Sequence, residues 1–138
     1  MNQRPWMAAV LWAAAVYNVV WGAAVVLAAP WTLGLLGLEP GSVDDITLAF
    51  WRCIGMIVGV YGVGYAAAAR DPLRHWPIVL VGFLGKIFGP VGFMQAAFID
   101  ETIPVTFGIT IIPNDLIWWI PFGAILLAAW KQRSTPSP

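Results

Sequence analysis

The chain has 138 residues, of which 60% are hydrophobic and only 10% are charged, and it contains nine tryptophans. Because soluble domains carry about 25% charged residues, this chain has too few to coat a water-facing surface. Seven basic and seven acidic side chains balance, so no net charge attracts nucleic acid. The single cysteine, Cys53, excludes an internal disulfide and a Cys-x-x-Cys site. The composition therefore indicates a polytopic membrane protein.

Four apolar stretches are long enough to cross a bilayer as helices, which requires about 20 residues each. They cover 6–29, 46–69, 76–99 and 108–130. We therefore predict a single all-α domain over 1–138, an integral membrane four-helix bundle. The first stretch exceeds the roughly 7–15 apolar residues of a signal peptide, so we expect it to remain as a span.

The segments between and after these spans carry turn-forming residues. The glycines and prolines of 30–45 predict irregular backbone or a short interfacial piece. The tail 131–138 ends in a run of Ser, Thr and Pro and is predicted to be disordered.

The charges outside the spans are distributed asymmetrically. The first and third connections contain acidic residues but no Lys or Arg. All basic residues outside the spans lie at the two ends of the chain or in the second connection: Arg4, Arg70, Arg74, Lys131 and Arg133. Since positive charge stays inside, both termini are predicted to be cytoplasmic. Tryptophans are predicted to form an aromatic belt at both interfaces.

Glycines recur at helical spacing in the second and third spans. Membrane helices associate through close packing of such small residues. We predict that these two spans pack against each other through their glycine faces, with a dimer interface as the alternative. The residues are Gly55, Gly59 and Gly62 in the second span, and Gly82, Gly85, Gly89 and Gly92 in the third.

Prolines interrupt the apolar pattern of the last two spans. Pro90 is expected to bend the third span because it removes a backbone hydrogen bond, and Pro113 and Pro121 are expected to interrupt the fourth. The sequence Pro113-Asn114-Asp115 is typical of a helix break followed by an N-cap. Broken spans of this type line binding cavities in transporters.

Three ionisable residues fall at membrane depth, where their cost makes them candidates for function. They are Arg52, Lys86 and Asp115. Together with the amides of Asn18 and Asn114 they are predicted to form one polar cluster in the outer half of the bundle. Its surplus positive charge would favour an anionic or carbonyl-bearing hydrophobic molecule, such as a fatty acid, a polyprenyl phosphate or a quinone. In the alternative, Arg52 and Asp115 pair and the cluster only joins helices.

Aromatic side chains accompany these polar residues along the predicted helices. Trp118 and Trp119 follow Asp115, with Phe122 on the same helical face, and Trp21 follows Asn18 by one turn. These rings are expected either to form the walls of a ligand pocket or only to pack the core. Tyr17, Tyr61 and Tyr65 belong to the same group.

The second connection contains Arg70, Asp71, Arg74 and His75. Its arginines are expected to anchor it to anionic headgroups, and a catalytic His75–Asp71 pair is the alternative. Because His75 is the only histidine, a His-rich metal site and a bis-histidine haem are excluded. We expect no metal and no cofactor.

Several short segments together resemble a widespread family of small bacterial membrane proteins with four spans. They are Tyr17-Asn18 with Trp21-Gly22, Trp51 with Gly55, Ala69-Arg70-Asp71-Pro72, His75-Trp76-Pro77, Gly85-Lys86 with Gly89-Pro90, and 114–122. The resemblance covers roughly 6–130 and implies a multi-pass protein of the bacterial inner membrane. Some members are labelled "alkyl hydroperoxide reductase", which the sequence does not support, since Cys53 has no resolving partner.

Three functions remain open at this point. The first is a carrier or accessory subunit that binds a membrane lipid or another hydrophobic small molecule. The second is a membrane-embedded enzyme that uses Lys86 and Asp115 for acid–base chemistry, and the third is a structural subunit. Because four spans are few for an independent transporter, a homo-oligomer or a subunit of a membrane complex is expected.

Overall fold

The computed structural model describes residues 5–39 and 41–134, which are helical with short connections and contain no β-strand. Helix α1 covers Pro5–Leu27, α2 Ala29–Leu35, α3 Asp45–Ala68, α4 Trp76–Met94 and α5 Ile117–Ser134. Two π-helical turns, η1 at Gln95–Ile99 and η3 at Ile112–Leu116, and a 3₁₀ helix, η2 at Val105–Thr110, extend the last two spans.

Four helical stretches are long and apolar enough to cross a membrane. They are Pro5–Leu27, Asp45–Ala68, Trp76–Ile99 and Val105–Ser134. These bounds agree with the predicted spans to within a few residues at each end. The all-α fold with four spans is confirmed, and it makes this chain a multi-pass membrane protein by length and composition.

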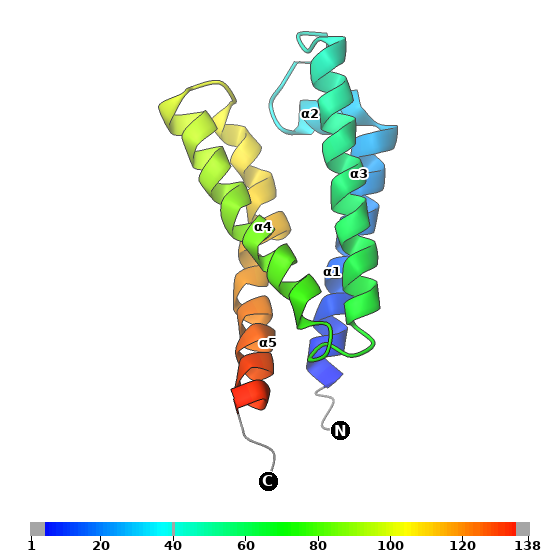
Figure 1. Cartoon of the computed structure of the whole chain (residues 1–138). Coiled ribbons are helices and arrows are strands. Elements are labelled where there is room, and N and C mark those ends of the chain that lie inside the picture. Colours follow the sequence, from blue (N-terminus) through cyan, green and yellow to red (C-terminus); the bar gives the residue numbers. More distant parts are fainter. Residues whose placement is uncertain (1–4, 40, 135–138) are drawn as a thin grey trace.

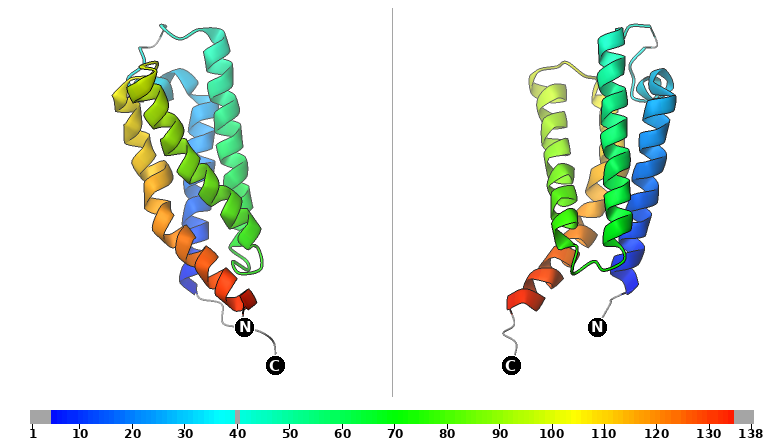
Figure 2. Two further views of the ribbon diagram at one scale, coloured as in Figure 1. Left: turned by 60° about the vertical axis from the view of Figure 1, so that its left-hand side comes forward. Right: turned by 45° about the vertical axis from the view of Figure 1, so that its right-hand side comes forward.

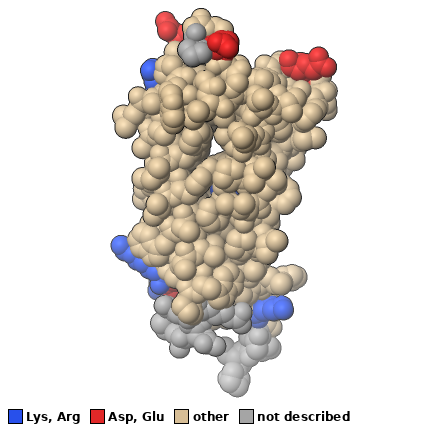
Figure 3. Space-filling view, turned by 180° about the vertical axis from the view of Figure 1, so that it is seen from behind, with Lys and Arg blue, Asp and Glu red and all other residues tan. Residues whose placement is uncertain are grey.

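The spans are arranged as two pairs, α1 with α3 and α4 with α5 (Figures 1 and 2). The start of α1 and the end of α5, the termini of the described chain, lie at the same end of the molecule (Figures 1 and 2). At the opposite end the two pairs are in contact, because the Thr106 hydroxyl of η2 donates a hydrogen bond of 3.1 Å to the Leu36 carbonyl and the Phe107 ring lies 5.7 Å from the Trp51 ring of α3. The face shown in Figure 3 is mostly uncharged. On this face most basic residues lie at the end that carries the termini, and the acidic residues at the opposite end are accompanied by one basic side chain (Figure 3).

The glycines of α3 pack against α1, so the predicted pairing of the second and third spans is wrong. A Cβ added at Gly22 of α1 would lie 2.5 Å from the Gly55 carbonyl oxygen and 2.7 Å from the Gly59 nitrogen. A Cβ added at Gly62 would lie 2.9 Å from the Ala15 carbonyl oxygen. The two backbones are therefore in direct contact, as small residues permit.

The glycines of α4 do not form a matching face. Gly82 lies against the Tyr65 side chain of α3, and Gly89 lies against the Asp115 carboxylate. A Cβ added at Gly85 or Gly92 would meet no described atom within 4 Å. Only one glycine of the predicted stripe thus contacts α3, and it contacts an aromatic side chain rather than another glycine.

The prolines of the fourth span are accommodated without the predicted break. The backbone remains helical through Pro113, where η3 widens into a π-helical turn, and α5 continues through Pro121. Since proline has no N–H to donate, a wider turn absorbs the lost hydrogen bond. Asp115 therefore lies inside a helical turn and is not an N-cap. Helix α4 also continues through Pro90, and the bend expected there stays a prediction.

The first connection contains the short helix α2, in agreement with the predicted interfacial piece. The buried Thr32 hydroxyl of α2 accepts a hydrogen bond from Trp51 Nε1 of α3 at 2.9 Å. Gly37 and Gly41 adopt positive φ angles of 89° and 94°, which favour glycine.

At the other end of the chain, α5 extends through Ser134, so the predicted disorder of 131–134 is wrong. Residues 135–138 and Arg4 lie outside the described residues.

Candidate functional site

Lys86 is buried in the middle of α4, with only 4% of its surface exposed. Its ammonium donates a hydrogen bond of 2.6 Å to the backbone carbonyl of Asn114. An ammonium has three N–H donors, and this is the one hydrogen bond that it donates to the described residues. Two donors therefore have no hydrogen-bond partner in the described part of the chain.

Aromatic rings from two helices surround this ammonium. The distances from Nζ to the ring centroids are 5.6 Å for Trp118, 5.8 Å for Tyr65 and 6.0 Å for Phe122. These distances lie within the range of about 6 Å for cation–π attraction. The rings contact one another, with Tyr65 and Phe122 edge to face at 5.2 Å. The rings therefore form a stabilising environment for a cation in an apolar surrounding.

Asp115 is the second buried ionisable group and is also 4% exposed. Its carboxylate accepts a hydrogen bond of 3.1 Å from the Asn114 side-chain amide and lies beside the backbone of Gly89. Asn114 thus joins the two charges, since its carbonyl binds Lys86 and its amide binds Asp115. Lys86 and Asp115 themselves are not in direct ion-pair contact within the described residues.

The backbone around these charges is fixed by indole hydrogen bonds. Trp118 Nε1 donates to the Pro113 carbonyl and Trp119 Nε1 to the Lys86 carbonyl, each at 2.9 Å. The first bond closes the π-helical turn, and the second ties α5 to α4. Five of the predicted residues therefore lie together, namely Lys86, Asn114, Asp115, Trp118 and Trp119.

Asn18 is buried, with 4% of its surface exposed, on the side of α1 that also carries Ala15 and Gly22. Its side-chain oxygen accepts no hydrogen bond from the described residues. The neighbouring Tyr17 ring lies 6.2 Å from the Trp118 ring, which places this part of α1 beside the cluster. Trp21 is half-buried and makes no hydrogen bond or ring contact with the cluster residues.

Arg52 does not join the cluster, so the prediction is wrong for this residue. It is exposed on the outer face of α3, whereas Gly55 and Gly62 of the same helix are buried. The pair between Arg52 and Asp115, which was the alternative to ligand binding, is absent for the same reason. The ionisable groups of the cluster are then one basic and one acidic side chain, and the predicted surplus positive charge disappears.

The connection between α3 and α4 forms a tight turn. The Asp71 carboxylate accepts a hydrogen bond from the Arg74 backbone N–H at 3.3 Å, and the His75 ring lies 3.1 Å from the Asp71 carbonyl oxygen. Because the ring contacts the carbonyl and not the carboxylate, the two side chains do not form the arrangement of a catalytic pair. Arg70 and Arg74 are exposed, as an anchoring role requires.

The comparisons with known proteins provide no relative for this chain. No family model, curated protein or solved structure matches it.

Proposed function

We propose that the chain binds a lipid-like molecule with a carbonyl-bearing headgroup at the cluster of Lys86, Asn114 and Asp115, as a carrier or accessory subunit. The observation that carries this proposal is the buried Lys86 ammonium, which donates one hydrogen bond, to the Asn114 carbonyl, and has no direct ionic partner among the described residues. A carbonyl oxygen is an acceptor that such donors can bind. The aromatic rings around the ammonium suit a flat or isoprenoid molecule.

The charge of the cluster narrows the choice of headgroup. One basic and one acidic side chain balance, so a neutral carbonyl compound such as a quinone adds no charge to a buried site. A fatty acid or a polyprenyl phosphate would add an anion that Lys86 has to balance beside Asp115. Burying an additional charge is costly, and a quinone-like molecule is therefore the first candidate.

Entry of such a molecule from the membrane requires an opening in the surface of the bundle. In the space-filling view, a narrow opening is visible in the half of the molecule away from the termini, and it is consistent with such entry (Figure 3). An acid–base enzyme is the weaker candidate, because Lys86 bonds to the Asn114 carbonyl rather than to the Asp115 carboxylate.

We propose that the chain lies in a bacterial inner membrane, surrounded by membrane lipid, with both termini in the cytoplasm. The basic residues at the end that carries the termini support this orientation. We also propose that the chain forms a homo-oligomer or is a subunit of a membrane complex. Gly85 and Gly92 of α4 are exposed, and such small residues allow another helix to approach closely.

Native mass spectrometry in mild detergent tests the proposed site with a short-tailed quinone as the probe. We expect one quinone per chain in the wild type, and its loss in Lys86→Met. Arg52→Met is the matched control, because it removes an exposed cation from another helix at membrane depth and should retain the quinone. Trp118→Leu, which keeps the ammonium and removes a ring, should weaken retention.

Two results would contradict the proposed site. One is a wild-type chain that retains no quinone, and the other is equal retention by the wild type and a folded Lys86→Met variant. If Lys86→Met lowers only the melting temperature while quinone remains bound, the cluster has a structural role.

A further inference from the structure

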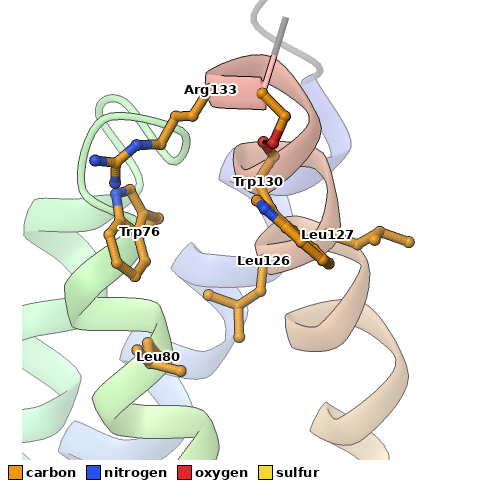
Figure 4. Close-up of a pocket in the computed structure, with 7 residues that line it drawn as sticks. Trp76, Leu80, Leu126, Leu127, Trp130 and Arg133 are labelled. Carbon is orange, nitrogen blue, oxygen red and sulfur yellow. Dashed lines mark hydrogen bonds between the residues drawn. The ribbon is translucent and has the colours of Figure 1, made fainter.

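An apolar pocket lies at the end of the molecule that carries the termini, far from the Lys86 cluster. Its volume is about 610 Å³, within the range of about 300–1,000 Å³ that is typical of small-molecule sites. The start of α4 and the end of α5 form its walls (Figure 4). The lining residues are Trp76, Leu80, Leu126, Leu127, Trp130, Arg133 and Ser134.

Among the described residues that line this pocket, Arg133 is the one cation. The Arg133 side chain extends from α5 toward α4, and its guanidinium lies 5.0 Å from the centre of the Trp76 ring (Figure 4). The stacking holds the guanidinium beside walls that are otherwise apolar or aromatic. Within the described residues Arg133 pairs with no carboxylate, so its donors are available to an anion.

The same end of the molecule carries further positive charge. Arg70 and Arg74 are exposed in the connection that leads into Trp76, and Lys131 precedes Arg133 in α5. Figure 3 shows basic side chains at this end. Arginines and lysines at a membrane surface attract anionic lipids by about 1 kcal/mol each. The pocket thus combines a hydrophobic interior with a positively charged rim.

From this arrangement we infer that the pocket binds one anionic phospholipid. An acyl chain lies between Trp76 and Trp130 over Leu80 and Leu126, and the headgroup phosphate binds Arg133. Phosphate diesters accept the planar, forked hydrogen bonds that a guanidinium donates. Free phosphate would leave the apolar walls unused, and a neutral lipid would leave the guanidinium without an anion.

This lipid site is independent of the proposed function. Lys86 lies ten residues after Trp76 in α4, and ten residues of helix correspond to about 15 Å. Neither the ammonium nor its aromatic neighbours line the pocket. Loss of one binding event therefore leaves the other measurable.

The test uses the full chain, delipidated in detergent and then titrated with phosphatidylglycerol or phosphatidylcholine of identical acyl chains. Native mass spectrometry counts the bound lipids. We expect one tightly bound phosphatidylglycerol, with affinity about fivefold lower in Arg133→Gln, the effect of one basic residue beside an anionic lipid. Arg52→Gln is the matched control at the opposite end and should bind as the wild type does. Leu126→Trp, which fills the pocket, should abolish the tight site.

Four outcomes would overturn the inference. They are equal binding of the two lipids, unchanged binding by Arg133→Gln, competition by glycerophosphate without acyl chains, and a dimer that binds no lipid. The last would show that a second copy covers the pocket. If Leu126→Trp fails to fold, the phosphatidylglycerol affinities of Arg133→Gln and Arg52→Gln still show whether Arg133 binds the lipid.

Discussion

The two helix pairs are held together by different means. Backbones touch directly between α1 and α3, where Gly22 meets Gly55 and Gly59. Polar groups join α4 to the last span, with Lys86 bonded to Asn114 of η3 and Trp119 of α5 bonded to the Lys86 carbonyl. The first interface has no room for a ligand, whereas the second has unused hydrogen-bond donors. We infer that the α1–α3 pair is the rigid support and that the α4–α5 pair carries the binding chemistry.

Gly22→Ala should have the largest effect on stability. The new Cβ would lie 2.5 Å from the Gly55 carbonyl oxygen, so the backbones have to separate. Overpacking of this kind typically costs about 1–3 kcal/mol. Thermal unfolding in detergent, followed by circular dichroism, measures the effect.

Gly59→Ala is the matched control within the same interface. A Cβ there meets no described atom within 4 Å, and alanine favours helix by up to about 1 kcal/mol over glycine. The variant should be neutral or more stable. Equal destabilisation by both alanines would show that α1 and α3 are not in backbone contact at Gly22.

Asp115→Asn should have the next largest effect. The substitution leaves the buried Lys86 ammonium without a nearby negative charge. Removal of one partner from a buried polar pair lowers the free energy of unfolding by about 1–3 kcal/mol. Lys86→Met removes the ammonium, so the double variant should lose less stability than the sum of the two single variants. A double-mutant cycle should give a coupling of about 0.5–3 kcal/mol.

The same cycle also decides whether the two charges belong to one site. If the stability losses of the two single variants add within about 0.5 kcal/mol, Lys86 and Asp115 do not interact energetically across Asn114. The polar interface between α4 and the last span would then consist of two separate contacts. The two helix pairs would no longer differ in the way proposed above.

Trp118→Phe should have a smaller effect. It removes the hydrogen bond from Nε1 to the Pro113 carbonyl but keeps an aromatic ring for Lys86. One such bond contributes about 0.5–1.5 kcal/mol. The melting temperature should fall while quinone retention persists. Loss of retention at full stability would show that the indole itself contacts the headgroup.

Asp44→Ala should have the smallest effect, at the start of α3. Hydrogen bonds from the side chain and backbone of Thr47 lower the pKa of Asp44 below its ordinary value. A group with a lowered folded pKa stabilises the fold above its unfolded pKa, and this contribution is lost as the pH falls through the folded pKa. The melting-temperature difference from wild type should therefore be present at pH 7 and shrink under acid conditions.

Asp45→Ala provides the control for this cap, since Asp45 is an exposed neighbour inside the first turn of α3. It leaves the bond from Thr47 N–H to Asp44 intact. A pH-independent deficit in Asp44→Ala would contradict a role for the ionised cap.

The positions of the spans could be predicted from the sequence because hydropathy and length determine them. The partner of each span could not, since the stripe of Gly55, Gly59 and Gly62 fits any neighbour with small residues. The neighbour in the structure is α1, where Gly22 is followed by two alanines and lies against Gly55 and Gly59. Small residues thus identify a close interface without identifying the helix across it.

The candidate site was only partly predictable for a similar reason. Sequence position gives the depth of Arg52 in the membrane but not the direction in which its side chain points, and it is exposed. Lys86, Asn114 and Asp115 meet because the last two spans, Trp76–Ile99 and Val105–Ser134, are neighbours with a short connection. The π-helical turn at Ile112–Leu116 could not be anticipated, since proline is compatible with either a break or a wider turn.

The most direct test uses the fact that the chain contains only two lysines, Lys86 and Lys131. With ¹⁵N at lysine Nζ and ¹³C at asparagine carbonyls, solid-state NMR in bilayers should show Lys86 coupled to the Asn114 carbonyl. Adding a quinone labelled with ¹³C at its carbonyls should create a new coupling to Lys86 Nζ and none to Lys131. A Lys86 signal that does not respond to the quinone would contradict headgroup binding at this cluster.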